Sequence, residues 1–401
     1  MRILKALLRP ESIIVASGIT ASLHLGKLAP AIVTLQNELH MSLVHSGLLL
    51  SLVQFIGMIS GVFWGAAVGK IGLKKSIYFG LFILTLSSAM GGMSTSVVSL
   101  FFLRATEGLG FVLVVLSGPG LIQALVTSER LNNTIGWWSA FMGLGTGFAL
   151  LFGTQITEVF GWRIWWWVTS LCTAIVLCSV KFIIPKDLES EITPDQSRQF
   201  FVHIFERLQF VFKDRTSWLL AIIFASAAGQ WLAIIGFLPS LYVTAEISVI
   251  WIGILTALVA LASSIGTVLG GKLLDRGGNP ETLLMISFSF SALMTWVSYV
   301  EYFRNFFALQ YLAIFLFSAI AGIIPTVLFS LSINRSPSPE LVSTTLGWMQ
   351  QISALGQVIT PPLFAMLAVA VGGWHYSWVI TDIMSLVGII LSIMLYRTAK
   401  Q

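Results

Sequence analysis

The sequence predicts an all-α membrane protein with twelve transmembrane helices in two six-helix bundles. Three observations lead to this fold class. Hydrophobic residues make up 56% of the 401 residues and charged residues only 10%, against about 25% charged in an ordinary soluble domain. The apolar residues gather in runs long enough to cross a bilayer. A pattern of glycine and charge recurs at matching places in the two halves of the chain.

Twelve apolar runs follow one another along the chain, each near the length of roughly 20 residues that a membrane-spanning helix needs. They are centred near residues 23, 57, 85, 112, 145, 174, 230, 260, 290, 320, 355 and 385. Each is expected to be a helix, because lipid offers the backbone no hydrogen-bond partners. The runs lack the alternation of transmembrane β-strands. The first run is long enough to span and has no cleavage site after it, unlike a signal peptide.

The basic residues predict the orientation of the spans. With the N-terminus inside, the inside segments hold all but four of the 22 lysines and arginines. The exceptions are Lys27, Arg104, Arg163 and Arg304. Since lysine and arginine are enriched on the cytoplasmic side, both termini are predicted to be cytoplasmic. The expected location is the inner (plasma) membrane of a bacterial-type cell, crossed many times.

A long polar loop divides the chain into two sets of six spans. Residues 1–184 are predicted to form the N-terminal bundle and residues 216–401 the C-terminal bundle. In the linker between them, residues 185–215, the stretch "PKDLESEITPDQS" has the composition of a solvated segment. The following "RQFFVHIFERLQFVF" places apolar side chains on one helical face, which predicts a helix on the inner membrane surface. A disordered linker is the alternative.

The inside loop after the second span of each half carries a similar motif, "GAAVGKIG" at 65–72 and "GKLLDRGG" at 271–278. Glycine permits a tight turn and close helix packing. An aspartate can accept from a helix N-terminus or an arginine, and a basic residue can anchor the loop at anionic lipid. A repeated plan of this kind is typical of secondary transporters. The residues that form the motif are Gly65, Lys70, Gly72, Asp275, Arg276 and Gly278.

The second copy resembles the loop signature Gly-x-x-x-Asp-Arg-x-Gly of the major facilitator superfamily. Two more stretches are similar to that family, "RATEGLG" at 104–110 and "FGWRIWWW" at 160–167. The resemblance covers essentially the whole chain. It implies the family's fold and mechanism, in which two bundles rock about a central site that opens to one side at a time. It also implies that the loop aspartate helps to close the inner gate. Gly69 replaces that aspartate in the first copy, while Asp275 and Arg276 keep the pair in the second.

The run "GKLAPAIVTLQNELHMSLVHSGLLLSL" is similar to the cyanate/nitroimidazole-type branch of the superfamily. This likeness implies a small solute, with an anion as one candidate class.

Ionisable residues inside spans are expensive and are therefore functional candidates. Arg104 and Glu107 are three residues apart and share a helix face. Such a carboxylate can load and release a proton, so the pair is predicted to act in proton coupling or gating. A structural ion pair that steadies the bundle is the alternative. The family usually has a glutamine-like residue where Glu107 stands, so the acid is a departure from its pattern.

Further residues are candidates for substrate binding. Lys27 could face the cavity and attract an anion, or extend its ammonium group toward the interface. His24, one turn earlier, could titrate or could be a packed, hydrogen-bonded residue. Asp382 is left open between a cavity group and a bond between helices. Glutamines in spans bind solutes or join helices, and this group comprises Gln230 with its neighbour Trp231, and Gln357. The run Trp165–Trp167 is predicted to be an aromatic belt at the membrane interface.

The sequence therefore predicts a secondary active transporter that moves a small solute by alternating access and is linked to protons. Efflux of drugs or siderophores is an alternative. The Gly-Pro pair usual in span five of drug exporters is missing from "GLGTGFALLFG", and Gly118-Pro119 lies in span four instead. A non-transporting membrane sensor or assembly factor is the alternative of another class.

Enzyme chemistry has no support in the sequence, because metal-ligand clusters, nucleophile–base spacings and phosphate-binding loops do not occur. Cys172 and Cys178 fit neither a disulfide framework nor a metal site. We expect no cofactor, no metal and no nucleic-acid partner. The expected partners are a small-molecule substrate, protons and the lipid bilayer, and a chain with two bundles can work as a monomer.

Overall fold

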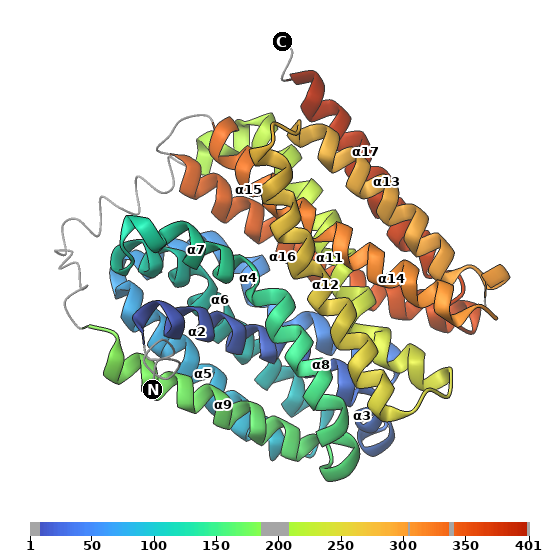
Figure 1. The fold of residues 1–401 in the computed structure, drawn as a ribbon. Coiled ribbons are helices and arrows are strands. Elements are labelled where there is room, and N and C mark those ends of the chain that lie inside the picture. Colours follow the sequence, from blue (N-terminus) through green and yellow to red (C-terminus); the bar gives the residue numbers. More distant parts are fainter. Residues whose placement is uncertain (1–8, 186–207, 304, 337–340, 399–401) are drawn as a thin grey trace.

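The computed structural model describes residues 9–185, 208–303, 305–336 and 341–398, and within these residues all regular structure is helical (Figure 1). The helices of the first half are α2 (Pro10–Gly26), η1 (Ala29–Ala31), α3 (Ile32–Leu39), α4 (Leu43–Ile71), α5 (Leu73–Gly92), α6 (Val97–Leu125), α7 (Ser128–Ser139), α8 (Phe141–Phe160) and α9 (Trp162–Ile183). Those of the second half are α11 (Arg215–Thr244), α12 (Val249–Asp275), α13 (Pro280–Tyr299), η2 (Glu301–Phe303), α14 (Phe307–Ala321), α15 (Ile323–Arg335), α16 (Val342–Val371) and α17 (Trp378–Thr398). The predicted all-α membrane fold class is confirmed.

Each predicted span centre lies in one of these helices. Within the described residues, ten helical segments are long and apolar enough to cross a membrane. Helices α5 and α8 are not among the ten. Two lysines follow the first residue of α5, and α8 contains several glycines and threonines, which lowers the mean hydropathy of both. The count of twelve crossings and the orientation of the termini stay predictions.

Polar side chains cap the beginnings of several long helices. At α4, α6, α11 and α13, the residue before the helix accepts a hydrogen bond from the backbone N–H three positions later, at 2.7–3.2 Å. Such a bond satisfies one of the N–H groups that a helix start leaves unpaired. The residue that precedes each of these helices therefore helps to determine where the helix begins. The capping residues are Ser42, Ser96, Asp214 and Asn279.

The helices of each half pack mainly on one another. In the first half, α2 packs on α6, α8 and α9, and α5 packs on α6 and α9. In the second half, α11 packs on α16 and α17, and α13 packs on α14 and α17. In Figure 1 the blue-to-green helices lie on one side of the molecule and the yellow-to-red helices on the other. The bundle boundaries at residues 184 and 216 stay predictions, and the predicted surface helix of the linker lies mostly outside the described residues.

Two helix pairs make most of the contacts between the halves, α4 with α16 and α8 with α12. Glycine residues allow the helices of both pairs to pack closely. A Cβ added at Gly47 would lie 2.8 Å from the carbonyl oxygen of Pro361, and one at Gly147 would lie 2.8 Å from the Leu261 side chain. Both distances are shorter than a carbon atom tolerates, so larger residues would push the halves apart. Small residues at helix contacts are a usual device of membrane proteins.

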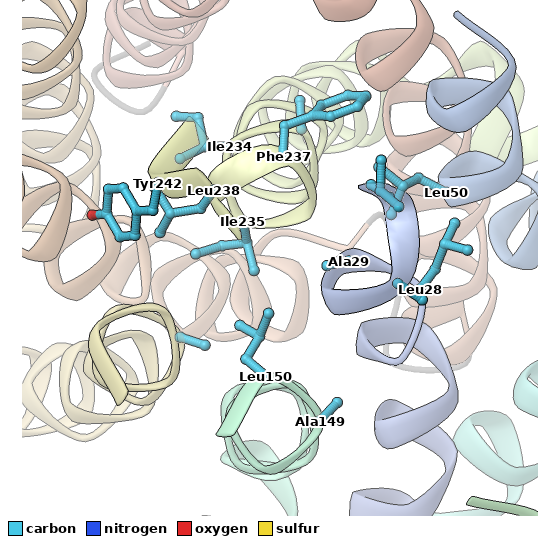
Figure 2. Close-up of a cluster of buried hydrophobic side chains, with 14 of the residues drawn as sticks. Leu28, Ala29, Leu50, Ala149, Leu150, Ile234, Ile235, Phe237, Leu238 and Tyr242 are labelled. Carbon is cyan, nitrogen blue, oxygen red and sulfur yellow. The ribbon is translucent and has the colours of Figure 1, made fainter. Parts of the chain in front are cut away.

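Apolar residues of both halves meet in one buried core near the turn between α3 and α4. The charge pattern predicts that this end of the molecule faces outward, and we refer to it as the predicted outer end. The core, here named the outer seal, is shown in Figure 2, and none of its labelled residues is more than 3% exposed. They are Leu28, Ala29, Leu50, Ala149 and Leu150 of the first half and Ile234, Ile235, Phe237, Leu238 and Tyr242 of α11. The seal holds the two halves closed against each other at this end.

Candidate functional site

The first predicted span is broken in its middle, and the break organises the candidate site. Helix α2 ends at Gly26, and Pro30 lies in the short η1 that follows. Proline has no backbone N–H and cannot continue the ladder of helix hydrogen bonds. Side chains of other helices bond to carbonyls around the break. Arg104 Nη1 of α6 donates to the His24 carbonyl at 2.7 Å, and Trp165 Nε1 of α9 donates to the Lys27 carbonyl at 2.9 Å.

The ammonium group of Lys27 lies in the core of the first half, with no exposed surface. Its Nζ is 2.5 Å from Glu107 Oε1, 2.7 Å from Ser88 Oγ and 3.2 Å from His24 Nδ1. These three acceptors use all three donors of the ammonium group. The Trp166 ring lies 4.9 Å from Nζ, within the range of a cation–π interaction. The bundle therefore holds Lys27 in a fully satisfied position.

The carboxylate of Glu107 joins the two cations. One oxygen receives the Lys27 bond and the other is 2.7 Å from Arg104 Nη1. Arg104 also reaches toward the Leu49 carbonyl of α4 through Nε, at 3.5 Å. Its buried Nη2 makes no hydrogen bond within the described residues. The predicted Arg104–Glu107 pair is thus part of a larger network that includes Lys27 and His24.

The hydrogen bonds fix the tautomer of His24. Thr173 Oγ1 donates its proton to the Thr169 carbonyl at 2.7 Å, so it accepts from His24 Nε2 at 2.7 Å. Nδ1 is then free to accept from Lys27. This assignment follows from the network of donors and acceptors. It makes His24 a neutral link between α2 and α9, and we call the group His24, Lys27, Arg104 and Glu107 the buried cluster.

The buried cluster carries more positive than negative charge. Lys27 and Arg104 face the single carboxylate of Glu107, and none of the three side chains is more than 1% exposed. Burying charge is costly unless it is paired and hydrogen-bonded. The network pairs two of the three charges and leaves one excess cation in the core of the first half.

Sequence reasoning missed the hydroxyl and indole partners of the cluster. Trp165 and Trp166 are buried, with 2% and 0% exposure, whereas Trp167 is 44% exposed. The prediction of an aromatic belt is therefore wrong for the first two, because their rings face the bundle core and contact Lys27. Ser88 and Thr173 lie in other helices far along the chain. The one feature of the sequence that could have indicated them is the repeated serine and threonine residues on the buried faces of α5 and α9.

The candidates of the second half do not come together in one network. Trp231 Nε1 donates to Ser318 at 3.1 Å, and Gln357 Nε2 to Ser353 at 3.4 Å. The partly buried Asp382 accepts from Thr295 at 3.0 Å. The contacting pairs join neighbouring helices or successive turns of one helix. Their roles in substrate binding stay predictions.

Gln230 of this group occupies a place that matches His24. It follows His24 by 206 residues, the offset that also relates the two loop motifs. Its Oε1 accepts from Ser385 of α17 at 3.3 Å, while its buried Nε2 has no partner within the described residues. His24 likewise bonds a hydroxyl group in the last long helix of its half. Both halves thus have a polar contact at this point, and in the first half Lys27 also bonds to it.

The loop motifs end α4 and α12 in tight turns. Gly72 has a φ of 94° and Gly277 one of 83°, a region that favours glycine. After α12 the N–H groups of Gly277 and Gly278 donate to the carbonyls of Leu274 and Leu273, each at 2.9 Å. Alignment of the two motifs pairs Gly72 with Gly278. The residue with positive φ in the second turn is instead Gly277, one position earlier.

The other motif residues lie around these turns. Asp275 and Arg276 are exposed. Gly65 and Lys70 belong to the last turns of α4. Within the described residues, histidine, cysteine and acidic side chains form no group of three that could hold a metal ion.

The family model of the Major Facilitator Superfamily matches residues 13–361 and 242–401. The chain belongs to the major facilitator superfamily. It is therefore a multi-pass membrane protein of a transporter family. The cyanate/nitroimidazole-type assignment stays a prediction.

Several curated proteins are similar to this member of the superfamily. Citrate exporter 1 of Aspergillus niger is 23% identical over 160 residues, which are 40% of this chain and 30% of the relative. The uncharacterized MFS-type transporter YuxJ of Bacillus subtilis is 23% identical over 335 residues, 80% of this chain and 81% of the relative. The multidrug efflux protein YfmO of Bacillus subtilis is 25% identical over 162 residues, 40% of each chain. The match to the citrate exporter thus spans less than a third of that relative's length.

Proposed function

We propose that the protein is a secondary active transporter of a small anion, coupled to protons and located in the inner (plasma) membrane. The observation that carries this proposal is the excess cation of the buried cluster. Two events can compensate an unpaired positive charge in a low-dielectric interior. An anion can approach it, or a proton can leave the network. Because either event removes the same excess charge, the two are coupled to each other.

The position of Lys27 links this charge to the outer seal. Leu28 and Ala29 follow it directly in the chain and are buried in the seal beside α11 (Figure 2). A change in the bonds of Lys27 therefore acts on the first two seal residues of the first half. The helix break before Pro30 supplies the local freedom for such a movement. In this proposal Arg104 and Glu107 set the position of Lys27, and Lys27 sets that of the seal.

The outer seal also has a role in the proposed transport cycle. Both halves share the apolar core at the predicted outer end. Alternating access requires that one end closes while the other admits solute. In this proposal the outer seal is the contact that closes the predicted outer side.

Export is the direction that the relatives favour. The named relatives include a citrate exporter and a multidrug efflux protein. A further one is a tetracenomycin C resistance and export protein of Streptomyces glaucescens, 28% identical over 134 residues, which are 32% of this chain and 24% of the relative. The first name agrees with an anionic solute and the other two with drug efflux. Efflux of uncharged or cationic drugs is therefore the second candidate function.

The charge excess predicts a specific transport phenotype for Lys27→Gln. This change leaves the neutral Arg104–Glu107 pair in place and removes the excess cation. We expect the half-saturating concentration of a transported anion to rise about tenfold or more, since each 1.4 kcal/mol is a factor of ten. The measurement is uptake of radiolabelled citrate and other small organic anions into proteoliposomes that contain a pH-sensitive dye.

The matched control is Lys181→Gln, which removes an exposed lysine at the end of α9. It should leave uptake unchanged. Anion uptake without any change of internal pH would refute the proton coupling. Transport of a cationic dye such as ethidium with no anion transport would instead establish the efflux function.

A further inference from the structure

The second half contains a carboxylic acid inside one of its candidate spans, Asp382 of α17. It lies one turn after the helix begins, and its Oδ1 is 3.0 Å from Oγ1 of Thr295, which lies one turn before the end of α13. Figure 1 shows α13 and α17 side by side at one edge of the molecule. The contact joins these two helices at the predicted outer end, in the half that does not contain the buried cluster.

No cation balances the charge of an ionised Asp382 within the described residues. Thr295 is the side chain that bonds to it there, and no ion pair among these residues includes it. Helices α11 and α13 pack against α17. Most of the ionisable side chains of these three helices lie at the other end of the bundle, far from Asp382. They are Arg215, Glu281, Tyr396 and Arg397.

The ionisable residues nearer to Asp382 do not pair with it either, among those that the structure describes. Tyr242 and Tyr299 lie near the ends of α11 and α13, and a phenol is neutral below a pH of about 10. His375 lies in the segment before α17, where its ring packs on Tyr376 with the ring centres 4.6 Å apart. An ionised carboxylate in apolar surroundings is costly unless a cation pairs with it. A proton on the carboxyl group itself supplies the positive charge that these neighbours do not.

Thr295 can bond to Asp382 in either protonation state. Its Oγ1 carries one proton and lies 3.0 Å from each of three acceptors, Asp382 Oδ1 and the carbonyl oxygens of Ser291 and Ala292. When the carboxylate is ionised, the threonine proton points to it. When the acid is protonated, its O–H donates to Thr295 Oγ1, and the threonine donates to a carbonyl of its own helix. The contact between α13 and α17 therefore survives the gain or loss of a proton.

Protons can reach Asp382 more readily than the buried cluster. Asp382 is partly exposed, whereas Glu107 is only 1% exposed. Its neighbours Ile383 and Leu386 are 58% and 55% exposed and belong to the apolar outer face of α17. The carboxyl group thus lies at the edge of a surface that suits lipid, one turn from the predicted outer end. A proton can enter there without passing through the outer seal.

Helix α17 connects Asp382 to the interior of the second half. Ser385 lies three residues later, on the same helix face. Its Oγ donates to Gln230 Oε1 of α11 at 3.3 Å. Gln230 is the residue that follows His24 by 206 positions. A change at Asp382 therefore acts on the helix that bonds to the counterpart of His24.

We propose that Asp382 is a proton-binding site of the second half and carries a proton in the arrangement described here. The site is separate from the buried cluster. Its role in transport, to exchange protons with the outer side, rests on the proposed function. Proton binding by Asp382 does not depend on that function and can be measured without a transported solute.

The test is labelling of the full chain in liposomes with dicyclohexylcarbodiimide, an apolar reagent that reacts with protonated carboxyl groups. Peptide mass spectrometry measures the label at each acid. At about pH 7 an ordinary aspartate, with a pKa of about 3.9, is almost fully ionised. We expect Asp382 to be labelled at least about tenfold more than Glu107, whose carboxylate bonds to two cations at 2.5 and 2.7 Å. Label at Asp382 at about pH 4 but not at about pH 7 would overturn the proposal, because it would show an accessible but ionised carboxylate.

Variants give a readout that does not depend on access of the reagent. Asp382→Asn resembles the neutral acid, and its amide can still donate to Thr295. It should lose the label and unfold at the wild-type temperature. An unfolding temperature below that of the wild type at about pH 7, but equal to it at about pH 4, would show that the wild-type carboxylate is ionised and would refute the proposal.

Thr295→Val removes the proton that Thr295 offers to an ionised carboxylate but keeps the shape of the side chain. The label at Asp382 should then persist to a higher pH than in the wild type. The control Thr106→Val removes an exposed hydroxyl group that bonds within α6 and should change nothing. Label at Asp382 in a protein that moves no protons during anion uptake would support the site and refute the proposed coupling alone.

Discussion

Replacing Glu107 with glutamine is expected to destabilise the protein more than any other single change in the buried cluster. The amide is nearly the same size as the carboxylate but carries no charge. Lys27 and Arg104, which now share the carboxylate at 2.5 and 2.7 Å, would become two buried cations without a counter-charge. Breaking a buried ion pair by removing one partner costs about 3–5 kcal/mol. The measurement is thermal unfolding in detergent, with the folded fraction followed by size-exclusion chromatography.

A set of three variants separates this explanation from general damage to the core. Lys27→Met should cost least, because it leaves the neutral Arg104–Glu107 pair. The double variant Lys27→Met/Glu107→Gln leaves one buried cation and should be more stable than Glu107→Gln alone. Replacing both members of a buried pair is often nearly neutral. If Lys27→Met proved as harmful as Glu107→Gln, or if the double variant were the worst of the three, charge balance would not be what stabilises the cluster.

The four residues of the buried cluster could be found in the sequence because charge inside an apolar run is conspicuous. Arg104 and Glu107 could also be paired, since three residues along a helix place two side chains on one face. That Lys27 joins them could not be predicted. It comes from a different helix, and its direction depends on how α2 packs against α6 and α9. The same information about packing decides whether Trp165 and Trp166 face lipid or the core, which is why the prediction of a belt is wrong for them.

The helices themselves were predictable because a membrane span must satisfy its own backbone and must be apolar over a fixed length. The outer seal was not. Leu50 and Ile235 look like any other apolar residues of a span, and only the packing of the halves buries one near the other. Gly277 could not be singled out from the sequence either. Four glycines occur in residues 270–278, and the geometry of the turn decides which of them has a positive φ.

The outer seal is expected to open when a polar group is placed inside it, as in Ile235→Asn. Ile235 is 1% exposed and lies among seal residues of both halves (Figure 2). In the closed arrangement the new amide is buried without partners, at a cost of about 1–3 kcal/mol. In an open arrangement water satisfies it. Because the cost falls on one state alone, the equilibrium should shift toward the outward-open state by roughly tenfold to a hundredfold.

Spin labels on opposite sides of the seal can report this shift. Asn37 in α3 and Tyr302 in η2 are exposed at the predicted outer end. Labels there, after replacement of the exposed Cys172 and Cys178 by serine, should show a new and longer distance population in Ile235→Asn. Ile250→Asn places the same amide on a residue that is 62% exposed at the start of α12 and should leave the distances unchanged. A variant that unfolds at lower temperature but keeps the wild-type distances would identify the seal as a permanent core. In that case the link from Lys27 through Leu28 to the outer end would not be a gate, and the buried cluster would act within the first half alone.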